Sequence, residues 1–401
     1  MISLAAPALI RGAPLIIESG QVAQMGDPDQ PLAQGYDFLR VEVGGVLQLR
    51  GEVSFTVAGD ITIDGAIVVD PTLKKMKAGP GLPGTDGDPG AGTGGTLGGH
   101  GTNWTFGGLP TLVLKAQGAA VIRGSIDFRT ELDGGDGGRG GHGVLRGGFT
   151  GTHAGEGGAA GHASLAPARV QIDASTIDLQ PGGQILLDSQ GRGGNGGDGG
   201  NGGDGGAGRN GGTAGGGGDG GNGGNGGVVI LRGDVLRIEG QISLTGGDGG
   251  DGGAAGLPGT GGDGRSGGNQ PGEGGGHAGN PGGSGPRGGN GGSGGLGGTL
   301  TLTANRELIY TTKARLTGGR SGQPGAGRPA GAATGGKGGS GNPPGPDGQS
   351  SGALLPGVAG RPGNEGTESI STGFIQGPIW QGPFNCSRPF VETDAGGVLR
   401  R

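Results

Sequence analysis

A strict three-residue repeat of Gly-Gly-X runs through the middle of the chain and constrains its fold more than any other feature. Residues 193–204 read Gly-Gly-Asn and Gly-Gly-Asp in strict alternation. A period of three fits the polyproline II-type helix, which has three residues per turn and rises about 3.1 Å per residue. Two of its three faces are then bare backbone. Neighbouring helices can therefore approach until their amide and carbonyl groups pair, and the repeat predicts rods packed side by side.

Glycine-rich tracts, called arms here, interrupt the chain repeatedly and contain most of its 118 glycines. They cover about 78–109, 133–166, 190–227, 246–298 and 318–367. The alternative to ordered rods is a disordered brush, because glycine loses more entropy on ordering than any other residue. The strict phase favours order in the third and fourth arms. The fifth arm is richer in Pro and Ala, and both interpretations stay open for it.

Short blocks of alternating apolar and polar residues separate the arms, and this period of two is typical of half-buried strands. The blocks cover about 53–70, 111–132, 168–189, 228–245 and 299–317. In the fourth block the expected inward-facing residues are Val229, Leu231, Leu236, Ile238, Ile242 and Leu244. Equivalent pairs start at Phe55, Leu112, Val170 and Leu300 in the other blocks. A partial block, with Val41/Val43 and Leu47/Leu49 as its pairs, precedes them.

Three strands in about 16 residues suit one coil of a small β-solenoid, and stacked coils bury a column that one coil cannot bury alone. The sequence therefore predicts an all-β chain: a short five-coil β-solenoid whose glycine-rich arms form a polyglycine-II helix bundle. Solenoid and arms would together occupy residues 46–367. Separate hairpins or a β-sandwich are the alternatives for the blocks.

The two ends of the chain differ in composition from the repeats. Residues 1–45 are expected to form a cap or an attachment region. Residues 368–401 hold several aromatic residues and few Gly-Gly pairs, which predicts a cap over the last open strand edge or a docking tail. The candidate docking residues are Phe374, Trp380, Phe384 and Phe390.

The Gly-Gly-X arms resemble the polyglycine-II bundles of bacteriophage tail-fibre tip adhesins and, more distantly, the glycine-rich antifreeze proteins of springtails. The resemblance is compositional and covers the arms, so it transfers no residue roles. The arms also contain two local variations of the Gly-Gly-X repeat. Residues 81–90 briefly fit the collagen pattern Gly-X-Y, but the run is too short for a triple helix. Prolines in Gly-Leu-Pro-Gly (81–84) and Gly-Gln-Pro-Gly (322–325) suit a polyproline-type backbone.

No constellation of residues points to catalysis, a metal or a cofactor. The segment 193–201 approaches a calcium-binding nonapeptide, but Gly200 stands where an apolar residue is needed. The histidines, all in arms, are interpreted as solvent-facing decoration, and the Asp and Asn residues as solubilising groups. Trp104, Phe106 and Phe149 are candidate recognition residues, or else plugs between the two parts of the fold.

A formal charge of −6 without a basic tail disfavours nucleic-acid binding. The single Cys386 excludes an internal disulfide framework, and neither a membrane span nor a secretory signal is recognised. We expect a non-enzymatic virion- or tail-associated protein, such as a fibre-tip adhesin, located on a virion or outside the cell. Its partners would be other virion or fibre subunits and a host-surface receptor. A self-assembling filament or surface subunit is the alternative, and an ice-binding protein is the third and least favoured hypothesis.

Overall fold

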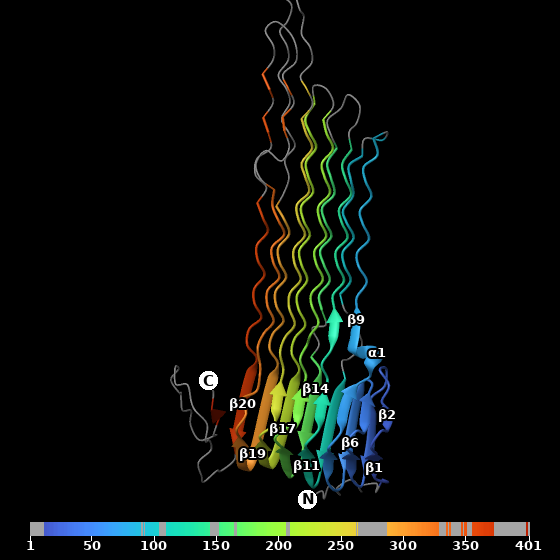
Figure 1. The fold of residues 1–401 in the computed structure, drawn as a ribbon, viewed down its shortest axis with the longest axis vertical. Coiled ribbons are helices and arrows are strands. Elements are labelled where there is room, and N and C mark those ends of the chain that lie inside the picture. The colour runs from blue at the N-terminus through green and yellow to red at the C-terminus, as the bar shows by residue number, and fades with distance from the viewer. Residues whose placement is uncertain are drawn as a thin grey trace, which may run out of the picture.

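The chain folds into a base of short parallel strands from which a long, thin bundle of glycine-rich rods projects (Figure 1). The computed structural model describes residues 12–89, 91, 93–103, 110–144, 152–163, 167–205, 209–261, 263, 287–328, 334–335, 337, 346–347, 349–350, 355–372 and 398–399. The predicted all-β class is confirmed. Within the described residues the only helix is the single turn α1 (Pro71–Lys74), and no helix there is long and apolar enough to cross a membrane.

The strands of the base pair in register with the equivalent strands of the blocks before and after them. The larger sheet follows the order β1 (Leu15–Ile17), β4 (Leu39–Val41), β7 (Ile61–Ile63), β11 (Ala119–Ile122), β15 (Thr176–Leu179), β17 (Val228–Ile238), β14 (Arg169–Asp173), β10 (Thr111–Ala116), β6 (Glu52–Val57) and β3 (Leu32–Tyr36). Beyond this path, β19 (Thr299–Tyr310) pairs with β17, β20 (Thr367–Thr372) with β19, and β21 (Val398–Leu399) with β20.

A second sheet has the order β18 (Gln241–Ser243), β16 (Gln184–Leu186), β12 (Ser125–Asp127), β8 (Ala66–Val69), β5 (Val46–Leu49) and β2 (Val22–Met25). A third pairs β13 (Glu131–Asp133) with β9 (Lys75–Lys77). Among the strands described, every pairing is parallel except that of β20 with β21. Parallel pairing places like positions of successive blocks next to one another.

This pairing stacks apolar side chains into one continuous core. Val229 lies between Val170 and Leu300, and Leu236 lies between Ile177 and Leu308. The six inward-facing residues of the fourth block, Val229, Leu231, Leu236, Ile238, Ile242 and Leu244, are all buried, with at most 2% exposure. In the fifth block Tyr310 and Leu316 are only partly buried. Tyr310 lies in the second half of β19, which does not pair with β20.

Two alignments made from spacing alone are corrected by the register. Leu112 pairs with Val53, so Phe55 is equivalent to Leu114 rather than to Leu112. The alternation in β6 extends over three inward residues, and spacing could not say which two matched the next block. In the partial block the inward pair is Leu39 and Val41, whereas Val43 is 72% exposed because β4 ends at Val41.

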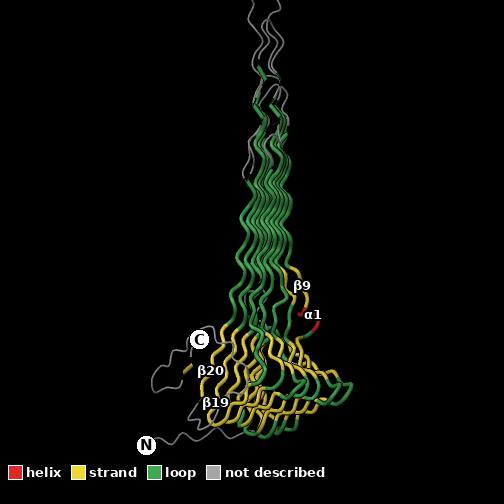
Figure 2. The backbone as a smooth tube through the Cα atoms, turned by 60° about the vertical axis from the view of Figure 1, so that its left-hand side comes forward, coloured by secondary structure: helices red, strands yellow, loops and turns green. Residues whose placement is uncertain are grey.

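The arms form paired rods that run away from the base and return (Figure 2). The ascending rods are 79–89, 134–144, 191–205, 246–261 and 318–328, and the descending rods are 93–103, 152–163, 209–227, 287–298 and 355–366. Backbone hydrogen bonds join each ascending rod to the next ascending rod and to descending rods beside it. Described parts of all five arms therefore belong to one hydrogen-bonded bundle.

Candidate functional site

The three positions of each triplet, called X, X+1 and X+2 here, have different hydrogen-bond partners. The ascending rods form one layer of the bundle and the descending rods form the other. At X+1 the amide donates to the carbonyl of X in the next arm of the same layer. Gly137 donates to Asn195 O at 2.8 Å, and Gly196 donates to Asp251 O at 2.8 Å. This bond recurs every third residue along the rods, so adjacent arms are tied together through their main chains.

At X+2 the amide points to the other layer. Gly138 donates to Gly99 O at 2.8 Å, Gly197 to Gly158 O at 2.9 Å, and Gly218 to Gly197 O at 2.8 Å. Ascending and descending rods are thus joined as firmly as neighbours within a layer. Both glycine amides of a triplet are satisfied without any side chain, which meets the requirement that buried backbone donors find acceptors.

The close approach of the rods explains why X+2 is glycine. A Cβ atom on Gly197 would lie nearer to the carbonyl oxygen of Gly138 than the 3.0 Å that real Cβ atoms keep, and one on Gly218 would meet Gly158 O in the same way. The main chains themselves occupy that space. Glycine is therefore needed at X+2 for contact between arms, in addition to any effect on backbone conformation.

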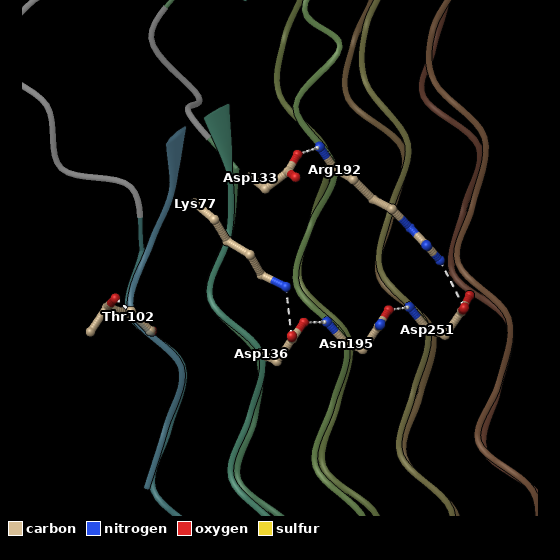
Figure 3. A network of polar contacts seen from close by, with 8 residues as sticks. Lys77, Thr102, Asp133, Asp136, Arg192, Asn195 and Asp251 are labelled. Carbon is tan, nitrogen blue, oxygen red and sulfur yellow. Dashed lines mark hydrogen bonds and ion pairs between the residues drawn. The ribbon is translucent and has the colours of Figure 1, made fainter. Parts of the chain in front are cut away.

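The side chain at X completes the pattern by accepting the amide of X in the following arm (Figure 3). Asn195 N donates to Asp136 Oδ1 at 2.9 Å, and Asp251 N donates to Asn195 Oδ1 at 3.0 Å. Gln323 N then donates to Asp251 Oδ1 at 2.8 Å. We call this row of side-chain acceptors the polar ladder. It gives the amide of X a hydrogen-bond partner that the main chain does not supply.

Histidines also occupy X positions of the polar ladder, where each accepts one amide hydrogen of the following rod; each such side chain-to-amide bond is called a rung here. Asn201 N donates to His142 Nδ1 at 2.8 Å, and Asn222 N donates to His162 Nδ1 at 2.9 Å. His100 and His153 accept from the amides of Ala159 and Thr213. His100 and His153 are exposed, as the sequence predicts, and His142 and His162 are half-buried, but each of the four imidazoles also links two arms, a role that the interpretation as solvent-facing decoration did not include. His277 lies outside the described residues.

Ion pairs reinforce the ladder where the bundle meets the base. Lys77 Nζ lies 2.6 Å from Asp136 Oδ2, and Arg192 Nη2 lies 2.7 Å from Asp251 Oδ2 (Figure 3). In the same region Arg192 N donates to Asp133 Oδ1 at 2.7 Å, and Thr102 Oγ1 donates to Gly79 O at 2.9 Å. Partial burial acts to raise the pKa of Asp136, but the hydrogen bonds from Lys77 and Asn195 N and the nearby cations hold this pKa below its ordinary value.

The ladder should make the bundle acid-sensitive. Because the pKa of Asp136 is lower in the folded state, the carboxylate contributes its stabilisation above the unfolded pKa, and this contribution is lost as pH falls through the folded value. We expect the unfolding temperature to decrease as the pH is lowered below about 4. Asp136→Asn keeps an oxygen acceptor but not the charge, so thermal unfolding of this variant should change less between pH 6 and pH 3. An equal change in both proteins would contradict this role of Asp136.

Removing one acceptor should weaken one rung. Asn195→Leu leaves the Asp251 amide without its partner, and we expect a loss of about 1 kcal/mol in the free energy of unfolding. Amide hydrogen exchange at Asp251 should accelerate. Asn195→Asp preserves an oxygen at the same position and is the matched control. Equal exchange rates at Asp251 in the two variants would exclude the side chain as the acceptor.

The base contains an open groove, of about 490 Å³, that crosses neighbouring strands at the ends of β6, β10 and β14. Lys115, Asp173 and Arg232 lie side by side along it, in register on adjacent strands. Ser175 also lines the groove, but its hydroxyl donates to Gly118 O at 2.7 Å. No histidine lines this groove, and the described residues contain no group of His, Cys, Asp and Glu that could hold a metal ion.

The aromatic residues singled out from the sequence are not among the described residues. This applies to the candidate recognition residues Trp104, Phe106 and Phe149 and to the candidate docking residues Phe374, Trp380, Phe384 and Phe390. The polar ladder, a regular polar feature of the described structure, was not predicted from the sequence. Its signal is the recurrence of Asp, Asn or His at one phase of the triplet in arm after arm.

No protein-family model matches the chain, and no curated protein matches its sequence. One similar solved structure is the nine polyproline type II helical bundle springtail antifreeze protein from Granisotoma rainieri. It is 20% identical, and the match covers 72% of this chain and 95% of that chain with a TM-score of 0.12. A TM-score this low carries no argument about the fold or function of this protein.

Proposed function

We propose that the parallel sheets of the base are coils of a β-solenoid and that the rods are polyglycine-II helices. In-register pairing of equivalent strands from successive blocks supports the first assignment. Hydrogen bonds that recur every third residue support the second. On this assignment each complete coil sends out one arm and resumes the stack when that arm returns.

We further propose that the protein is a non-enzymatic spike, a virion- or tail-associated adhesin that holds a recognition surface away from its base. The observation that carries this proposal is the direction of the arms: all leave the same side of the base and run together (Figures 1 and 2). A rod of the length of 191–205 extends roughly 45 Å at about 3.1 Å per residue. Hydrogen bonds between the main chains along this length favour a stiff projection over a flexible tether.

The placement of the chain supports opposite roles for the two ends of the spike. The first and last described strands, β1 and β21, both belong to the base, which suits attachment to another subunit. In each arm the ascending rod runs away from the base and the descending rod returns to it, so the two are connected on the side away from the base (Figure 2). Recognition would then belong to the far end, where contact with a host surface is unobstructed.

The experiment measures attachment of the fluorescently labelled full-length protein to a panel of intact bacterial cells. A variant in which residues 264–286 are replaced by Gly-Gly-Asn-Gly shortens the connection between the ascending and descending rods of the fourth arm and leaves the described rods unchanged in sequence. We expect saturable attachment to particular strains by the native protein and at least a tenfold loss in the variant. Hydrogen exchange of residues 193–203 should stay unchanged. Attachment to no strain, or equal attachment by the two proteins, would contradict the adhesin proposal.

A further inference from the structure

The two outer arms of the bundle depart from the glycine pattern of the inner arms, and the departures follow from their position. In the inner arms a Cβ atom at X+2 would clash with the preceding arm. This holds for Gly138 against Leu82 O and Gly253 against Gly197 O, and also for Gly322 of the fifth arm against Gly250 O. In the described rods of the second to fifth arms X+2 is glycine, with the exceptions Val144, Thr152, Arg209 and Arg328.

The first arm has no preceding arm and does not keep this rule. Its X+2 positions include Leu82, Thr85, Asp88, Thr96 and Thr102. Leu82 is 79% exposed. A further arm placed against this edge would meet these side chains where inner arms have only backbone.

Prolines on the first arm remove donors as well as space. In inner arms the amide of X donates to the X side chain of the preceding arm, as Asn195 N does to Asp136. The equivalent ascending positions of the first arm include Pro80, Pro83 and Pro89. Proline has no amide hydrogen, so these positions need no partner and offer none. The Gly-X-Y pattern at 81–90 therefore belongs to the edge of a bundle and not to collagen.

The fifth arm is blocked at a different phase of the triplet. Its X+1 amides would donate to a sixth arm, but Pro324, Pro356 and Pro362 have none. In the inner descending rods a Cβ at X+1 points toward the next ascending rod, as at Gly291 and Gly294. There the fifth arm has side chains instead, namely Pro356, Ala359, Pro362 and Glu365.

The polar ladder also ends at the fifth arm. Its X positions include Arg320, Ala326, Leu355, Val358 and Arg361, none of which can accept an amide hydrogen through its side chain. Leu355 and Val358 are 64% and 59% exposed. Within the rods 318–328 and 355–366, only Gln323 and Asn364 keep an amide side chain at X. In the base, β21 pairs antiparallel with β20 at Ile370 and Ser371, which interrupts the parallel stack on the same side.

We infer that the side chains and prolines at both edges of the bundle prevent a further arm from packing there. A second copy of this chain therefore cannot dock its fifth arm against the first arm. Exposed strand edges are sites of unwanted association, and proteins block them with prolines and side chains. A regular glycine bundle has the same hazard, because every inner arm is a template for the next. This inference rests on bundle geometry alone and holds whether or not the far end binds a receptor.

The wild-type protein provides the first test. Sedimentation velocity should give the monomer mass over a hundredfold range of concentration. Leu82→Cys and Pro356→Cys would face each other if a fifth arm docked on a first arm in the register of the inner arms, and in a Cys386→Ser background they should give no intermolecular disulfide under mild oxidation. Concentration-dependent growth together with a disulfide between the two introduced thiols of different molecules would overturn the inference without requiring any destabilised variant.

Opening the edges provides the second test. One variant changes Leu82, Thr85, Asp88, Thr96 and Thr102 to Gly, and Pro80 and Pro83 to Asn; the other changes Pro324, Pro356, Ala359, Pro362 and Glu365 to Gly. Each alone should remain monomeric, and an equimolar mixture should double in mass. Hydrogen exchange of residues 193–203 reports whether both bundles are intact. Two intact variants that do not associate would overturn the inference, and if either fails to fold, the wild-type test decides.

Discussion

Gly197→Ala is expected to lower the free energy of unfolding by about 3 kcal/mol or more, a large loss for a change of one methyl group. The new Cβ would overlap the carbonyl oxygen and the carbonyl carbon of Gly138, which belongs to the preceding arm. The overlap involves backbone on both sides and cannot be relieved by a rotamer change. The second and third arms must separate locally, which breaks the bond from Gly197 N to Gly158 O.

Gly79→Ala is the matched control, since Gly79 is also an X+2 residue of an ascending rod. It belongs to the first arm, and a Cβ there would contact only Thr102 Oγ1 at 3.5 Å, an ordinary van der Waals distance. We expect this variant to stay within about 0.5 kcal/mol of wild type. Thermal or denaturant unfolding of the two variants compares them directly. Equal losses would contradict the packing explanation and indicate that both changes act through glycine flexibility.

Leu236→Asp is expected to unfold base and bundle together. Leu236 is fully buried between Ile177 and Leu308 in the column of the core. Burying an unpaired carboxylate there should cost at least about 4 kcal/mol, a large part of the stability of an ordinary domain. Because the base fixes both ends of every arm, the rods should lose their hydrogen-exchange protection in the same step.

Arg237→Ala tests whether the effect belongs to burial. Arg237 is the next residue on β17, and its side chain is half exposed. Its Nη2 atom lies 3.6 Å from Oε1 of Glu307. Exposed ion pairs contribute little, and we expect a loss below about 1 kcal/mol. Circular dichroism and hydrogen exchange should find the Arg237 variant folded. Loss of base structure in the Leu236 variant with the rods still protected would contradict the coupling of the two parts.

The base was largely predictable because its signal is local. Alternation identified Val229, Leu231 and Leu236 as core residues, and stacking of equivalent blocks followed from their repetition. Register was less predictable. Phe55 was aligned with the wrong residue because β6 has three inward positions, and only pairing with β10 decides between them.

The bundle was predictable in kind but not in its chemistry. Gly-Gly-X indicated rods in contact, yet the partner of each X side chain lies in another arm, far away in sequence. Asp136 and Asn195 are 59 residues apart, whereas Asn195 and Asp251 are 56 apart. Since arm lengths differ, no fixed spacing identifies the rungs. The edges did leave a signal, which is the change from two glycines per triplet to one near residues 81–89 and 356–366.

Hydrogen–deuterium exchange of the native protein tests the central claim most directly, namely that the glycine rods are ordered by bonds between their main chains. The decisive peptides come from residues 191–205 and 209–227, compared with β17 of the base. The structure predicts that their glycine amides exchange nearly as slowly as the amides of β17. Exchange at the rate of an unstructured peptide, with β17 still protected, would contradict it and leave a base that carries a disordered glycine brush.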